Sequence, residues 1–400
     1  MGERGGREGA GREPGGFRAT TPVGAPGFVT VRLDGVARAR APRAGGSIFR
    51  RERTARGAGA RPSRPFADVS NGRLIVTGGA GFIGSAAIWQ LNALGHDDIL
   101  CVDALRTGDK WKNLVGLRVA DVLHKDDFLA RLARDPGQFG PVAGVLHMGA
   151  CSATTERDAD YLLANNTRYT ATLCDWALAR GTRFVYASSA ATYGDGAQGF
   201  DDDPARLEAL VPLNMYGFSK HLFDLQAQRS GRLARIAGLK FFNVFGPNEY
   251  HKGEMMSVVC KAVRQVRATG RLSLFESYRD DYGHGEQMRD FVYVKDCVRA
   301  MAWLLEHPEA NGLFNLGTGR ARSWNDLAHA VFTALGVPPA IDYVAMPESI
   351  RDRYQYFTEA TMSRLAATGC PVPRTALEDA VADYVTNYLV PGERTLGVAG

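Results

Sequence analysis

Short apolar runs alternate with stretches of helical periodicity over most of the chain. The runs include residues 74–76, 98–103, 142–148 and 183–187, and between them apolar residues recur three or four positions apart. Continuous apolar runs are typical of strands buried on both faces of a parallel sheet, and the periodic stretches are typical of the helices that cover such a sheet. The pattern therefore predicts an α/β fold with a doubly wound parallel sheet.

The regular alternation breaks after Gly246. Residues 235–246 still have the pattern of one strand, but a polar loop follows at 247–253, then a helix at 255–269 and a second polar loop at 274–288. The polarity of the second loop is typical of a mobile surface segment.

Strand and helix patterns return in the last third of the chain. Short strands are expected at 289–294 and 312–317, and Ser323 should cap a helix that ends at Gly336. Because 400 residues exceed what one hydrophobic core usually holds, we expect two domains and an extension. They are a Rossmann-type domain of residues 71–246 and 289–319, a smaller α/β substrate-binding domain of residues 247–288 and 320–400, and residues 1–70.

Residues 1–70 differ from the rest in composition. They are rich in Gly, Ala, Pro and Arg, without sustained periodicity, and hold fourteen arginines against six acidic residues. The net charge of +5 therefore resides in this extension, and the remainder is mildly acidic. We interpret the extension as a disordered tail or the product of a start codon placed too far upstream. A nucleic-acid-binding arm and a transit peptide are the alternatives, and four glutamates weaken the latter.

Apolar segments and cysteines indicate the compartment. The chain has no apolar run of membrane-spanning length and no secretory signal core, so we expect a cytoplasmic protein without a membrane or nucleic-acid partner. Its six cysteines show no metal-ligand spacing and several lie in apolar contexts, which predicts buried free thiols and no metal site.

A glycine-rich turn joins the first predicted strand to the first predicted helix. Gly78, Gly81 and Gly84 follow the strand at three-residue spacing, and residues 83–94 have a helical pattern. In a dinucleotide site the first glycine allows a sharp turn, the second lets backbone N–H groups approach a pyrophosphate, and the third lets the helix pack closely. A glycine triplet also occurs in turns without a ligand, but the flanking strand and helix favour dinucleotide binding.

Asp103 ends the second predicted strand, about twenty residues beyond the glycines, where an acidic residue meets the adenine ribose. An acid there favours NAD through the 2′-hydroxyl. However, Arg106, Lys110 and Lys112 follow closely and could hold the 2′-phosphate of NADP instead. The residues alone leave the choice of cofactor open.

Small residues also follow the strand at 142–148. The loop of residues 148–152 comes after the carboxyl end of that strand, and parallel strands present these ends at the same edge of the sheet. We therefore expect the loop to line the same crevice as the glycine turn, through Met148, Gly149, Ala150, Cys151 and Ser152.

The strongest chemical signal is a tyrosine and a lysine four residues apart. Tyr216 and Lys220 share one face of a predicted helix, so an ammonium group near the phenol should lower its pKa and allow proton exchange with an alcohol. Ser189, at the end of a predicted strand, should orient the same substrate oxygen. Such a pair is common on helix surfaces by chance, but its place after a dinucleotide turn favours catalysis.

From about Leu74 to Tyr388 the chain resembles the extended short-chain dehydrogenase/reductases. Residues 77–84, 216–220 and 243–247 carry the general pattern of that superfamily. Narrower motifs resemble its ADP-heptose 6-epimerases, and they lie at residues 147–156, 187–194, 251–253, 274–276, 289–294 and 353–355.

The resemblance implies roles for individual residues. NADP, with NAD not excluded, would contact Phe82, Ile83, Asp103, Lys110, Lys125, Asn165, Lys220, Val244 and Lys252. Tyr216 and Lys252 would form an acid/base pair on opposite sides of the substrate, although the pattern around Lys252 by itself is that of an ordinary exposed lysine. Substrate-side residues would be Asn243, Glu254, Lys261, Phe275, Glu276, Arg289 and Tyr354. Ala104, Met148, Glu254 and Lys261 depart from the residues familiar at these positions, and the loop 277–288 looks longer than usual.

The implied reaction interconverts ADP-D-glycero-D-manno-heptose and ADP-L-glycero-D-manno-heptose at C6″, through a transient ketone, for lipopolysaccharide core synthesis. The resemblance also implies a homo-oligomer, specifically a homopentamer. Another nucleotide-sugar enzyme, such as a hexose 4-epimerase or a 4,6-dehydratase, is the nearest alternative. A regulatory protein that senses a dinucleotide is the alternative without catalysis.

Overall fold

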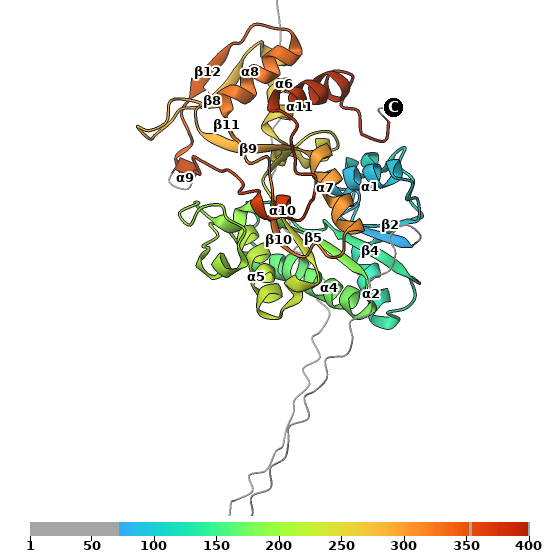
Figure 1. Ribbon diagram of the computed structural model, residues 1–400. Coiled ribbons are helices and arrows are strands. Elements are labelled where there is room, and N and C mark those ends of the chain that lie inside the picture. The colour runs from blue at the N-terminus through green and yellow to red at the C-terminus, as the bar shows by residue number, and fades with distance from the viewer. Residues whose placement is uncertain (1–71, 352–353, 399–400) are drawn as a thin grey trace, which may run out of the picture. The chain divides into compact units, whose positions relative to one another are not determined.

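The computed structural model of the protein describes residues 72–351 and 354–398. Seven strands form a parallel main sheet in the order β10-β6-β5-β4-β1-β2-β3, and the order reverses between β1 and β4 (Figure 1). The predicted doubly wound sheet is therefore confirmed. The strands are β1 Arg73–Thr77, β2 Ile99–Asp103, β3 Asp121–His124, β4 Val142–His147, β5 Arg183–Ser189, β6 Ala237–Phe241 and β10 Gly312–Leu316.

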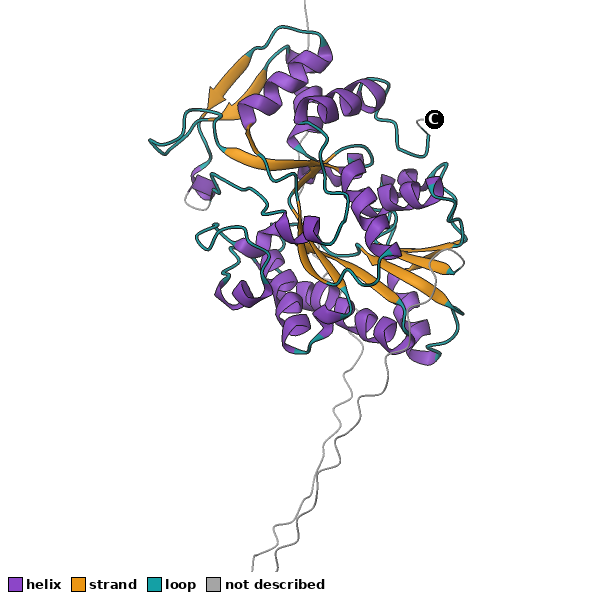
Figure 2. Ribbon diagram, viewed as in Figure 1, coloured by secondary structure: helices purple, strands orange, loops and turns teal. Residues whose placement is uncertain are grey.

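Helices cover both faces of the main sheet, as Figure 2 shows. α1 (Phe82–Ala93) and α7 (Val294–Glu306) pack on one face, while α2 (Lys125–Arg134), α4 (Tyr169–Arg180) and α5 (Met215–Arg229) pack on the other. Side chains alternate across a strand, so Leu74 and Val76 of β1 join the core under α1 and α7, and Ile75 joins the opposite core. A strand buried on both faces requires the continuous apolar run that the sequence contains.

Residues 235–246 form two strands, and the prediction of a single strand is wrong. β6 ends at Phe241 in the main sheet, whereas β7 (Asn243–Phe245) pairs with β9 (Met288–Tyr293) in a separate sheet. The chain crosses between the sheets at Phe242, whose N–H donates to the Leu316 carbonyl oxygen at 3.1 Å. Phe241, Phe242 and Phe245 are all buried, so the apolar pattern gives no sign of the crossing.

Smaller sheets and three helices form the rest of the fold. β11 (Ala321–Ser323) pairs antiparallel with β9, and β8 (Leu272–Phe275) pairs parallel with β12 (Ile341–Val344). α6 (Val258–Thr269), α8 (Trp324–Leu335) and α11 (Leu377–Tyr384) lie near them (Figure 1). The predicted cap of α8 is confirmed, since the Ser323 hydroxyl accepts from the Asp326 N–H at 3.0 Å and Gly336 ends the helix in a left-handed conformation.

Short helical turns connect these elements. They are η2 Asp109–Leu114, α3 Ala159–Leu162, η3 Leu163–Arg168, η4 Ala190–Tyr193, η5 Pro204–Ala209, η6 Arg232–Ala234, η7 Tyr250–Met255, α9 Glu348–Arg351, α10 Ser363–Ala367 and η8 Val385–Leu389.

The predicted extension, residues 1–70, lies outside the described residues, and the division of the remainder into two domains stays a prediction. Within residues 72–351 and 354–398, no helix combines the length and the apolar character needed to cross a membrane. Five of the six free cysteines are buried, and Cys151 is partly exposed.

Candidate active site

A cavity of about 680 Å³ opens at the carboxyl ends of β1, β2, β4 and β5. It lies where the strand order reverses, which is the place where doubly wound sheets bind ligands. All residues predicted for the cofactor and for catalysis line it: Gly78, Gly81, Phe82, Ile83, Gly84, Asp103, Lys110, Lys125, Met148, Gly149, Ala150, Cys151, Ser152, Asn165, Ser189, Tyr216, Lys220, Val244 and Lys252.

The glycine turn has the geometry of a dinucleotide cradle. Gly78 adopts a φ of 65°, in the region that disfavours residues with a Cβ atom. A Cβ atom on Gly84 would lie 2.1 Å from the Gly78 carbonyl oxygen, so only glycine lets α1 begin this close to the turn. The cavity beside the N-terminus of α1 therefore fits an anionic dinucleotide.

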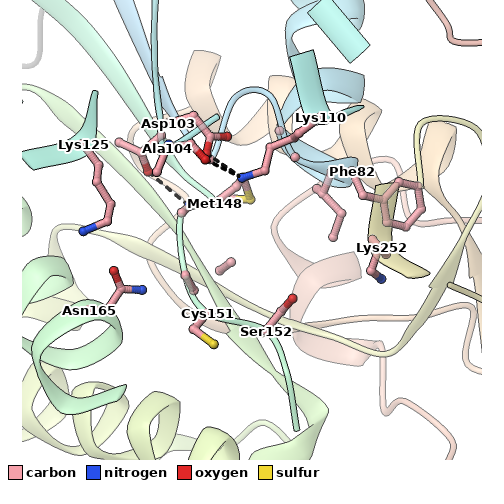
Figure 3. Close-up of a pocket in the computed structure, with 18 of the residues that line it drawn as sticks. Phe82, Asp103, Ala104, Lys110, Lys125, Met148, Cys151, Ser152, Asn165 and Lys252 are labelled. Carbon is pink, nitrogen blue, oxygen red and sulfur yellow. Dashed lines mark hydrogen bonds and ion pairs between the residues drawn. The ribbon is translucent and has the colours of Figure 1, made fainter. Parts of the chain in front are cut away.

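Asp103 is held in place by its own protein neighbours. Its carboxylate accepts from the Ala80 N–H at 2.9 Å and from the Lys110 ammonium at 2.7 Å, the ion pair drawn in Figure 3. Arg106 and Lys125 also line the cavity, and Lys125 pairs with Asp126 at 2.6 Å, while Lys112 pairs with Asp109. The residues therefore present positive charge as well as a carboxylate to the ribose end of a dinucleotide.

Asn166, which the sequence analysis missed, joins the loop after β4 to α5. Its side-chain oxygen accepts from the Cys151 N–H at 2.8 Å, and its amide donates to the Cys151 carbonyl and to the Ser219 hydroxyl, each at 3.0 Å. This contact fixes the loop of residues 148–152 against the helix that carries Tyr216. The pair Asn165-Asn166 was the available signal, but only its first member lines the cavity.

Tyr216, Lys220 and Ser189 meet at the base of the cavity. The Lys220 ammonium donates to the Ala187 carbonyl oxygen at 2.8 Å, and burial lowers its pKa to about 8, against the opposing charge of Asp224. Enclosure by the cavity raises the pKa of Tyr216, and the Ser189 hydroxyl opposes that rise. The lowering of the Tyr216 pKa predicted from its lysine neighbour is therefore not found, because desolvation is the largest influence on the phenol.

Lys252 reaches the same cavity from η7, a different element. Its ammonium lies 5.2 Å from the centre of the Phe82 ring, and Figure 3 shows the two side chains together. Burial lowers the pKa of Lys252, while the carboxylate of Glu249 opposes this shift. Burial thus makes the Lys252 ammonium a stronger acid than a lysine in water, which is the direction that acid/base work requires.

His251 also lines the cavity, and the sequence analysis assigned it no role. Its Nδ1 lies 3.1 Å from the amide of Asn113, a buried residue of η2. Burial, with smaller contributions from Lys110 and Lys252, lowers the pKa of His251 to about 4, so the ring is neutral at pH 7 and can accept this hydrogen bond.

Three of the predicted substrate-side residues form a second cluster, away from the cavity wall. The Arg289 guanidinium lies 5.2 Å from the centre of the Tyr354 ring, and Phe275 meets the same ring edge to face. Trp324, which we did not predict, covers Arg289 at 5.7 Å and donates to the Tyr354 hydroxyl. Arg289 is thus a buried cation held by aromatic rings.

The four other residues predicted on the substrate side have different surroundings. Asn243 is exposed at the start of β7, and Glu276 is partly buried after β8. Glu254 and Lys261 form an ion pair with each other at 3.1 Å. Phe275 and Arg289 therefore meet at the Tyr354 ring, whereas Glu254 and Lys261 contact each other.

Comparisons with known proteins agree with this geometry. Residues 74–317 match the model of the NAD dependent epimerase/dehydratase family. The protein named ADP-L-glycero-D-manno-heptose-6-epimerase from Nitratidesulfovibrio vulgaris (strain DP4) is 58% identical over 319 residues, which cover 80% of this chain and 98% of that protein. Its namesake from Fusobacterium nucleatum is 46% identical over 325 residues, covering 79% and 98%. The crystal structure of the Helicobacter pylori enzyme of the same name aligns with a TM-score of 0.67 at 26% identity, over 80% of this chain and 96% of that one.

The dinucleotide cradle, the tyrosine–lysine pair and the matched family define a nicotinamide-dependent nucleotide-sugar enzyme with a Rossmann-type fold. Within that class, the chain belongs to the ADP-L-glycero-D-manno-heptose-6-epimerase family. It is therefore an isomerase, and the alternatives of a hexose 4-epimerase or a regulatory protein are not favoured.

Proposed function

We propose that this epimerase inverts C6″ of ADP-glycero-D-manno-heptose through a transient ketone, with NADP retained in the cavity. One observation carries the mechanism: Tyr216 and Lys252 reach a single cavity from separate elements, α5 and η7, and the dinucleotide turn lines the same cavity. Inversion requires proton exchange with the substrate hydroxyl on both sides of the carbon, so it needs two separated acid/base groups. The names of the relatives support the ADP-heptose substrate.

In this mechanism the bound nicotinamide supplies both the acceptor and the donor of the hydride. The protein residues handle the protons. Tyr216 or Lys252 removes the hydroxyl proton of one epimer as its C6″ becomes a ketone, and the other residue protonates the oxygen after the ketone has turned in the site. Ser189 orients the oxygen beside Tyr216, and Lys220 stabilises the phenolate from below.

NADP is the cofactor that the charges favour. Arg106, Lys110 and Lys125 all line the cavity, and Lys110 offsets the carboxylate of Asp103 that would otherwise repel a 2′-phosphate. We expect mass spectrometry of the small molecules released from denatured enzyme to show NADP in preference to NAD.

The reaction itself can be tested without added cofactor. When purified enzyme is mixed with ADP-D-glycero-D-manno-heptose alone, NMR should show the L-glycero epimer forming over many turnovers, because the hydride returns to the carbon that lost it. UDP-hexoses and dTDP-hexoses should remain unchanged. Turnover of those sugars, with none of the ADP-heptose, would overturn the substrate assignment.

The two-base mechanism is tested by Lys252→Met and Tyr216→Phe. Each should slow epimerisation by about 10²–10⁴-fold, the usual contribution of a positioned acid/base group. Lys295→Met is a matched control, because Lys295 pairs with Asp383 and its side chain lies outside the cavity. Near-normal epimerisation by Lys252→Met would show that a second base at this position is not needed.

A further inference from the structure

Lys252 belongs to a loop, residues 246–257, that is held by buried polar side chains. Asn248 is fully buried with a φ of 80°, and its amide donates to the Ser85 hydroxyl of α1 at 2.9 Å. The Asn248 carbonyl oxygen accepts from the amide of Asn113, which also donates to the Ala80 carbonyl oxygen in the glycine turn. The loop that carries Lys252 is thus tied directly to the dinucleotide cradle.

The C-terminal segment of residues 393–397 closes on the same loop. The Leu396 N–H donates to the side-chain oxygen of Asn248 at 2.8 Å, and the Tyr250 hydroxyl donates to the Arg394 carbonyl oxygen at 2.8 Å. Leu396 is buried, so the segment is packed into the fold. Figure 1 shows this red segment leaving α11 toward the region that holds α1.

Two further contacts hold the C-terminal segment of residues 393–397 and the loop of residues 246–257 in place. A Cβ atom on Gly116 would lie 2.1 Å from the Gly397 carbonyl oxygen, so the segment packs tightly on the turn after η2. On the other side, the buried Glu249 carboxylate accepts from the Tyr384 hydroxyl at 3.0 Å and from the Ser257 hydroxyl at 2.6 Å. The loop therefore has partners before and after Lys252, but the Lys252 ammonium itself faces the cavity.

We propose that residues 393–397 form a clamp that positions Lys252 for catalysis, with Asn248 and Tyr250 as the positioning residues through which it acts. This inference rests on the proposed role of Lys252 as the second acid/base group. Proton transfer depends steeply on distance, and a misplacement of about 1 Å can cost roughly 10²-fold in rate. A flexible lysine on an irregular loop needs such external support, whereas Tyr216 is fixed by a regular helix.

Two variants loosen the clamp without altering the catalytic groups. Asn248→Gly keeps the left-handed backbone but removes the bonds to Ser85 and Leu396, and Tyr250→Phe removes only the bond to Arg394. We expect kcat to fall by about 10- to 100-fold in the first and by a smaller factor in the second, and cofactor content to stay unchanged in the second. Asp383→Asn is the control, because Asp383 lies in α11 but contacts Lys295 and Tyr293 instead of the loop.

Double mutants separate positioning from general destabilisation. If the clamp acts through Lys252, Asn248→Gly should cause no further loss in a Lys252→Met background, yet its full loss in a Tyr216→Phe background. Equal losses in both backgrounds, or normal kcat in both single variants, would overturn the clamp. If Lys252→Met alone keeps near-normal epimerisation, the proposed two-base mechanism fails, which is a different result.

Discussion

Burial and a neighbouring charge act in opposite directions on the pKa of Lys220. Its ammonium is buried and donates to the Ala187 carbonyl oxygen, desolvation lowers its pKa to about 8, and the buried carboxylate of Asp224 acts in the opposite direction. Asp224 is itself fixed, since it accepts from the hydroxyls of Tyr186 and Ser188 at 2.8 and 2.6 Å. The charge of Lys220 thus depends on a network one helical turn further along α5.

This balance predicts the alkaline limb of the pH–rate profile. Epimerisation should decline above about pH 8, because the proposed mechanism uses the positive charge of Lys220 to stabilise the Tyr216 phenolate, and Lys220 loses that charge there. The effect of Lys220 on stability has the opposite sign. The unfolded chain keeps the proton up to about pH 10.5, so unfolding takes up a proton in that window and the free energy of unfolding rises with pH.

Rates and melting temperatures measured at the same pH values therefore distinguish the two effects. A fall in rate without a fall in melting temperature supports the assignment to Lys220. A rate that stays constant up to about pH 10, near the ordinary pKa of lysine, would contradict it.

Sequence reasoning found the residues whose neighbours lie close along the chain, such as Tyr216 with Lys220. It missed Asn113, Asn166 and His251, whose partners come from distant segments; Asn113 and His251 are 138 positions apart. It also gave the wrong direction for the pKa of Tyr216, because desolvation depends on the enclosing cavity and leaves no pattern in the sequence.

At the scale of elements, the first βαβ unit, with β1, α1 and β2, decides whether a cofactor can be held. We expect Gly84→Ala to lower cofactor content and stability, because the added Cβ atom would lie 2.1 Å from the Gly78 carbonyl oxygen and must push α1 away from the turn. Bound nicotinamide after purification and the midpoint of urea unfolding are the measurements. Gly137→Ala is the matched control, since its Cβ atom would meet only side-chain ends. Equal cofactor content in both variants would refute the close-packing argument.

Elements with a strong periodic pattern and an end signal were predicted well, and α8 between Ser323 and Gly336 is the best example. The strand β3 was not predicted, because it is an edge strand with only Leu123 of its four residues buried. The change of sheet at Phe242 was missed because the residues before and after it are also buried, so the apolar pattern continues across the crossing. An apolar pattern indicates that a residue is buried, but it does not indicate which hydrophobic core the residue joins.

At the scale of the whole molecule, the segments that form and support the site extend from β1, which begins at Arg73, to Gly397. The cavity is lined by residues between Thr77 and Lys252, the matched family covers residues 74–317, and residues 393–397 close on the loop of Lys252. Within the part of the chain that the structure describes, residues far apart in sequence are therefore needed for one site. A fragment that ends before α11 should bind and react poorly.

Residues 1–70 lie outside the described residues, and their removal provides the last prediction. We expect the deletion to leave kcat/KM for ADP-heptose and the content of bound cofactor unchanged, because the residues assigned to the site begin at Thr77. A matched deletion that also removes β1 should lose the cofactor, since β1 is an inner strand of the main sheet and leads into the glycine turn. The extension carries fourteen arginines and six acidic residues, so retention on a heparin column, compared before and after deletion, measures its affinity for polyanions independently of catalysis. A loss of activity in the shorter deletion would show that the extension takes part in the site.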